Sequence, residues 1–171
     1  MRKAGIFAVL LVLLAGINFS IWRTEQALAN GQKVILQLAP VDPRSLMQGD
    51  YMALNFAMGE QIRGLLGTDK PVTGHAVIKL NAQGVARLVR LDDGQPLQDG
   101  ERLLQFRYRE HRVQFATNAF FFQEGTGERY EAARYGLFRV SDDGKPLLTH
   151  LLDAEQTIIG QTAVLSEQTT H

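Results

Sequence analysis

The sequence predicts a mostly β protein, in which an N-terminal transmembrane helix precedes a small antiparallel β barrel or sandwich with one or two short helices. Three observations lead to this prediction. Residues 4–22 contain no charged side chain. Short runs of alternating polar and apolar residues follow, separated by turns rich in Gly and Asp. The 171 residues, 45% of them apolar, are enough for one domain with its own core.

The uncharged run at residues 4–22 is long enough for a membrane helix, because about 1.5 Å per residue takes it across most of a hydrocarbon core of about 30 Å. Arg2 and Lys3 precede the run and Arg23 follows it. This weak bias places the N-terminus in the cytoplasm and the following domain outside. The small residues around Ala29 also fit a signal peptide cleaved after that position, although the length of the run favours a retained anchor.

Three segments follow from this reading of the chain. Residues 1–29 form the signal anchor, residues 30–165 an extracytoplasmic β domain, and residues 166–171 a polar, flexible tail.

In the first half of the domain, the expected elements follow from alternating polar and apolar residues and from residues that end a strand or a helix. We expect a first strand at residues 33–38, which the prolines at positions 40 and 43 end. A second strand is expected at residues 50–56, with Met52, Leu54 and Phe56 facing one side. Apolar residues at helical spacing then predict a short helix over residues 58–66 that ends at Gly67.

Hairpins account for the second half. Residues 75–80 and 85–91 flank a Gly-containing turn, and residues 102–109 pair with 112–115. A third hairpin joins residues 135–140 to 147–152. A closing edge strand is expected over residues 158–165, which gives seven or eight strands in all.

Composition excludes several classes of function. With no cysteine there is no disulfide, thiolate zinc site, cysteine nucleophile or iron–sulfur cluster. Basic and acidic residues number 18 each, so we expect no nucleic-acid partner. The four histidines lack metal-binding spacing, and we expect neither a metal nor a cofactor. The arginines of residues 106–112 should line one strand face and contact lipid head groups or an acidic partner.

Residues 40–56 hold the densest cluster of motif residues. Asp42 is placed to cap a turn, and Arg44 and Asp50 are close enough in the loop to pair. Gly49 permits a sharp entry into the strand, and Tyr51 points into its surroundings. The cluster is either a structural clamp or part of a binding site.

A second block spans residues 120–136, where three phenylalanines lead into a loop with Glu124. We expect these rings to form core with one of them exposed. Glu128, Glu131 and Arg134 follow; they either extend a carboxylate site or, on a helix, leave Glu131 paired with Arg134.

Both blocks resemble the bacterial family named after the motif G-D-Y-x-x-L-x-Y. Gly49, Asp50, Tyr51 and Leu54 match the motif, and Phe56 stands where the motif has its last tyrosine. The resemblance covers nearly the whole chain. It implies a protein of the bacterial inner membrane with a cytoplasmic N-terminus, a periplasmic β domain and no established activity. Some members of the family are fused to multi-pass membrane proteins or occur together with them.

We therefore expect a single-pass module embedded in the lipid bilayer that acts as an interaction or accessory partner of a multi-pass membrane protein. One alternative is a serine–lysine hydrolase with Ser45 as nucleophile and Lys79 as base, which requires a buried lysine near the hydroxyl. Another is a ligand-binding barrel released by cleavage. Replacing Ser45 by alanine separates the first two, since a clamp tolerates the loss of one hydroxyl and a nucleophile does not.

Overall fold

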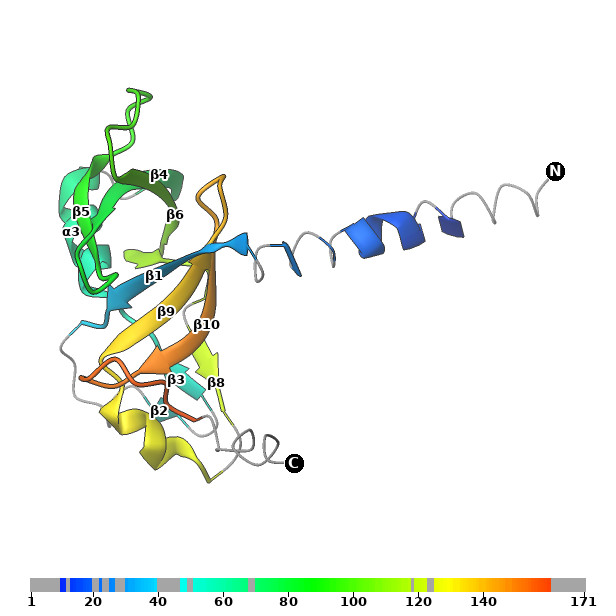
Figure 1. Ribbon diagram of the computed structural model, residues 1–171, viewed down its shortest axis with the longest axis vertical. Helices are drawn as coiled ribbons and strands as arrows, with labels where there is room; N and C mark the ends of the chain where they lie inside the picture. Colours follow the sequence, from blue (N-terminus) through cyan, green and yellow to red (C-terminus); the bar gives the residue numbers. More distant parts are fainter. Residues whose placement is uncertain are drawn as a thin grey trace, which may run out of the picture.

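The computed structural model describes residues 10–11, 13–19, 22, 25–26, 30–39, 47–48, 51–67, 70–117, 119–122 and 125–160. Ten strands, the helix α3 and the 3₁₀ helix η1 lie in this part of the chain (Figure 1). In chain order they are β1 (Gln32–Gln37), β2 (Met47–Gln48), β3 (Tyr51–Ala53), α3 (Ala57–Leu66), β4 (Val72–Leu80), β5 (Ala86–Leu91), β6 (Glu101–Arg109), β7 (Arg112–Gln114), β8 (Ala119–Phe121), η1 (Gly127–Ala132), β9 (Tyr135–Val140) and β10 (Pro146–Leu152).

The strands form three antiparallel sheets, which confirms the mostly β class. Their strand orders are β1-β9-β10, β2-β3-β8 and β5-β4-β6-β7. The first and last of these curve into a half-barrel (Figure 1). Two backbone bonds hold its halves together: Ile35 N–H donates to the carbonyl of Gly84 at 3.0 Å, and Gln105 N–H donates to that of Gly144 at 2.7 Å.

The core fills the concave side of the half-barrel, as the alternation of the strands predicts. On β6, Leu104, Phe106 and Tyr108 are buried while Arg107 and Arg109 are exposed. The side chains expected to face inward from the second predicted strand are also buried: Met52, Leu54 and Phe56. The three predicted hairpins appear as β4–β5, β6–β7 and β9–β10.

Helix α3 confirms the predicted helix and its end at Gly67, whose φ of 58° is the left-handed conformation that glycine favours. Met58 and Ile62 are buried, but Leu65 is 58% exposed. The contact stripe runs along positions spaced by four residues and continues to Leu66, which packs against the core. Leu65 therefore falls outside it.

The predicted closing strand over residues 158–165 is wrong where the structure describes it. Ile158 makes a single bridge with Leu152, and the Ile159 N–H donates to the carbonyl of Leu151 at 2.9 Å. No strand includes residues 158–160. The two prolines expected to end the first strand lie outside the described residues.

The described N-terminal residues are largely helical and project from the domain beside the start of β1 (Figure 1). Among the described residues, no helix combines the length and the apolar character needed to cross a membrane.

Candidate functional site

The structure describes only some of the predicted site residues. Six of them lie outside it: Asp42, Arg44, Ser45, Gly49, Asp50 and Glu124. The clamp of Asp42, Arg44 and Asp50 therefore stays a prediction. Tyr51, Leu54, Lys79 and Arg134 are described.

The described part of the first motif has some residues in the core and one near the surface. Leu54 and Phe56 lie in the core, and the Phe56 ring meets those of Phe115 and Phe138 edge-on, at centroid distances of 5.9 and 5.4 Å. Tyr51 pairs with Phe121 across β3 and β8, with ring centroids 5.9 Å apart. The motif thus attaches β3 to the core and presents one aromatic residue near the surface.

The three phenylalanines of the second block divide as expected into core and surface. Phe120 and Phe122 pack on the ring of Tyr130, at centroid distances of 5.2 and 5.1 Å. Phe121 is 74% exposed. Together with Tyr51 it forms an aromatic pair on the β2-β3-β8 sheet.

Arg134 does not form the predicted ion pair with Glu131. Its Nη1 donates to the backbone carbonyls of Glu131 at 3.0 Å and of Ala133 at 2.8 Å. The segment is a 3₁₀ helix that ends at Ala132, so Arg134 lies beyond its end, where unpaired carbonyls attract a cation. The arginine caps the helix.

Lys79 is exposed on the outer, convex face of β4, directly opposite Glu101 of β6. A lysine base needs burial to lower its pKa to the working range. Lys79 lacks the burial that the hydrolase alternative requires, so its position gives that alternative no support.

Glu101 belongs to the least exposed ion pair among the described residues, with its side chain 3% exposed. Its carboxylate accepts a hydrogen bond from Gln98 N–H at 3.0 Å and one from Arg90 Nη1 at 2.8 Å. The Gln98 bond first, and then Arg90, lower the pKa of Glu101 below its ordinary value. Because the folded-state pKa is the lower one, the pair stabilises the fold above the ordinary carboxyl pKa of 4.5, and this contribution is lost as pH falls through the folded-state value.

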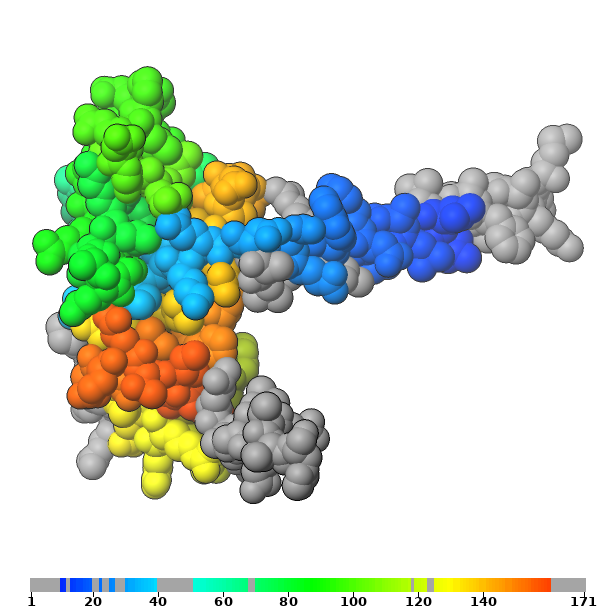
Figure 2. All heavy atoms as spheres, in the orientation of Figure 1, coloured from blue at the N-terminus to red at the C-terminus, as the bar shows by residue number. Residues whose placement is uncertain are grey.

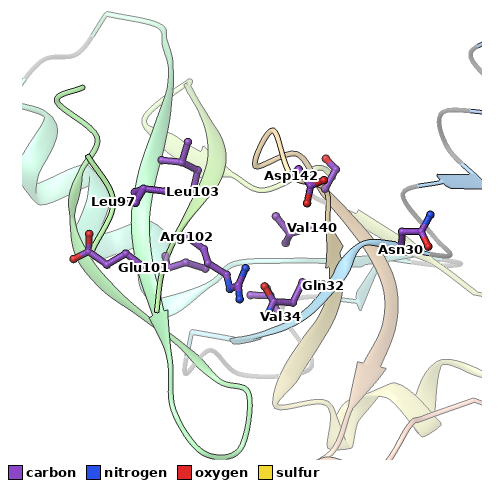
Figure 3. Close-up of a pocket in the computed structure, with 11 residues that line it drawn as sticks. Asn30, Gln32, Val34, Leu97, Glu101, Arg102, Leu103, Val140 and Asp142 are labelled. Atoms are coloured by element: carbon purple, nitrogen blue, oxygen red, sulfur yellow. The ribbon is translucent and has the colours of Figure 1, made fainter. Parts of the chain in front are cut away.

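A cleft of about 360 Å³ opens between β1 and β9 on one side and β4 and β6 on the other (Figure 3). Its floor is apolar and includes Val34, Ile78 and Val140, all buried. Gln32 and Arg102 supply polar groups, and in Figure 3 their side chains extend toward each other.

Sequence reasoning missed Arg102 and Gln32, although the pattern contains a signal for both. Arg102 shares the inward side of β6 with Leu104 and Phe106, while Arg107 and Arg109 share the outer side. In the same way, Gln32 shares the inward side of β1 with Val34 and Leu36. A polar residue at an inward position near a strand end marks the open end of a barrel.

No group of three or more His, Cys, Asp or Glu residues within the described ranges is arranged to hold a metal ion.

Comparison with known proteins identifies the family. Neither the curated proteins nor the solved structures contain a match to this chain. The family model described as GDYXXLXY protein matches residues 13–151, which is most of the sequence and includes both motif blocks. The chain belongs to the GDYXXLXY family.

Proposed function

We propose that the protein is a single-pass membrane-anchored module whose β domain lies outside the cytoplasm and serves as an accessory partner of a multi-pass membrane protein. The observation that supports this best is the exposure of apolar side chains along the N-terminal segment (Figure 2).

Seven apolar side chains of this segment are between 48% and 68% exposed: Leu10, Leu11, Leu13, Leu14, Ile17, Phe19 and Trp22. At 100° per residue they occupy most of the helix circumference, so no single face could cover them by packing on the domain. The core of the domain contains none of them. A helix that is apolar nearly all round requires an apolar environment, and a bilayer supplies one.

The aromatic pair of the half-buried Tyr51 and the exposed Phe121 is the surface we assign to the partner. Phe121 is 74% exposed and β8 is an edge strand of its sheet. Aromatic residues are enriched at the centres of protein interfaces, where a few of them contribute most of the binding energy. In the sequence, Tyr51 directly follows Asp50 of the predicted clamp.

Cross-linking tests this proposal. The full-length chain is cross-linked briefly in its native membranes, purified in mild detergent, and its co-purifying proteins are identified by mass. We expect a stoichiometric multi-pass protein, and we expect Phe121→Ala to reduce its recovery at least about tenfold, the effect of losing an interface hot spot of about 2 kcal/mol.

Leu65→Ala is the matched control, because Leu65 is also an exposed apolar residue but lies on α3. It should leave recovery unchanged. A native chain that purifies alone would contradict the accessory function. Equal recovery with Phe121→Ala and Leu65→Ala would contradict the assignment of the surface.

A further inference from the structure

The cleft between the two sheets lies at the end of the half-barrel where the N-terminal segment joins β1. Asn30, a helical residue two positions before β1, is part of its wall (Figure 3). Mouths of β-barrels are common ligand sites, and small-molecule pockets range from about 300 to 1,000 Å³. A volume of about 360 Å³ places this cleft at the small end of that range.

The polar groups of the cleft are not paired with one another. Arg102 has no ion-pair partner among the described residues, and neither does Asp142, an exposed carboxylate at the rim. Gln32 Oε1 is buried and accepts no hydrogen bond from the described residues. Glu101 also borders the cleft, and its Oε2 already accepts hydrogen bonds from Arg90 and from the backbone of Gln98.

These groups define the charge of a complementary ligand. A simple anion would pair with Arg102 but would face the negative charge of Asp142. A simple cation would be repelled by Arg102. A molecule that carries both an anionic group and an ammonium pairs with both side chains, because an ammonium donates to a carboxylate and an anion accepts from a guanidinium.

We propose that this cleft binds a small zwitterion, with its phosphate or carboxylate on Arg102 and its ammonium on Asp142. The methylene groups between the two charges lie on the apolar floor of Val34 and Val140. This inference does not depend on the accessory function.

Phosphoethanolamine is a suitable probe, since it has a phosphate and a primary ammonium separated by two methylene groups. The full-length chain is purified in an uncharged maltoside detergent, and binding is measured by isothermal titration calorimetry. Glycerol 3-phosphate, which has the anion without the ammonium, is titrated in parallel. Nanodiscs containing phosphatidylethanolamine or phosphatidylcholine then distinguish a lipid head group from a free molecule.

We expect saturable binding of phosphoethanolamine that is tighter than that of glycerol 3-phosphate. Arg102→Gln should weaken it at least about tenfold, since a charge-assisted pair is lost. Arg107→Gln, on the same strand but on the outer face, should leave it unchanged. Asp142→Asn should reduce the preference for phosphoethanolamine over glycerol 3-phosphate, which a purely structural role would not do.

Three results would overturn the proposal. One is the absence of saturable binding of phosphoethanolamine up to about 10 mM. Another is equal affinity for phosphoethanolamine and glycerol 3-phosphate. The third is equal loss of binding with Arg102→Gln and Arg107→Gln, both confirmed as folded by circular dichroism. A gain in affinity with phosphatidylethanolamine over the soluble probe supports a head group as the ligand, and no gain supports a free zwitterion.

Discussion

Replacing Phe56 by alanine is expected to lower the free energy of unfolding by about 3–5 kcal/mol, the usual cost of removing a buried phenylalanine ring. Phe56 is 3% exposed and its ring meets Phe115 and Phe138 edge-on. A Cβ at Gly136 would lie 3.0 Å from Phe56 Cε1, so the ring also covers a position that has no side chain of its own. Little is available to fill the resulting cavity.

Urea titration followed by far-ultraviolet circular dichroism measures this effect on the full-length chain in detergent. Circular dichroism is the suitable signal because the single tryptophan, Trp22, lies outside the domain. Phe121→Ala is the matched control and should change stability by no more than about 0.5 kcal/mol, since its ring is exposed. Similar losses for Phe56→Ala and Phe121→Ala would contradict the packing described for the motif.

Replacing Gly144 by alanine is expected to lower the free energy of unfolding by about 2–5 kcal/mol, from a strained backbone and a crowded contact together. Gly144 has a φ of 80°, and a Cβ there would lie 3.0 Å from Leu103 Cβ and 3.2 Å from the Leu103 backbone carbon. The neighbouring atoms belong to a strand and cannot move aside cheaply. The carbonyl of Gly144 also accepts the hydrogen bond from Gln105 that joins the sheets.

Gly94→Ala separates the two contributions to the Gly144 effect. Gly94 has nearly the same φ, 81°, but no atom lies within 4 Å of a Cβ built there. Its substitution should therefore show only the backbone cost of about 1–2 kcal/mol. The same urea titration compares the two variants. Equal losses of unfolding free energy in the two variants would contradict the close contact between Gly144 and Leu103 of β6.

The local elements of the fold could be predicted from the sequence because they depend on neighbouring residues. The alternation over residues 102–109 specifies which side chains of β6 face inward, and the turn at Glu110 and His111 closes the hairpin with positive φ at both residues. The split of the phenylalanines at 120–122 into core and surface follows from the same rule.

Features that depend on contacts distant in the sequence could not be predicted in this way. The pattern around Glu131 and Arg134 fits an α-helix, but whether that turn forms as α or 3₁₀ depends on the strand that follows and on its packing. The half-barrel is closed by bonds of Ile35 with Gly84 and of Gln105 with Gly144, and alternation says nothing about either. The cleft exists only because of this closure.

We propose that the N-terminal segment lies in the membrane with the β domain on its outer side. Since the chain contains no cysteine, single cysteines can be introduced and labelled with a membrane-impermeant maleimide. Suitable variants are Lys3→Cys before the apolar run, Leu14→Cys within it, and Gln95→Cys in the exposed loop between β5 and β6.

In spheroplasts, we expect labelling of Gln95→Cys before lysis, of Lys3→Cys only after lysis, and of Leu14→Cys only after detergent dissolves the bilayer. If Leu14→Cys were labelled before detergent as fast as Gln95→Cys, or if Gln95→Cys required lysis, the claim would be contradicted.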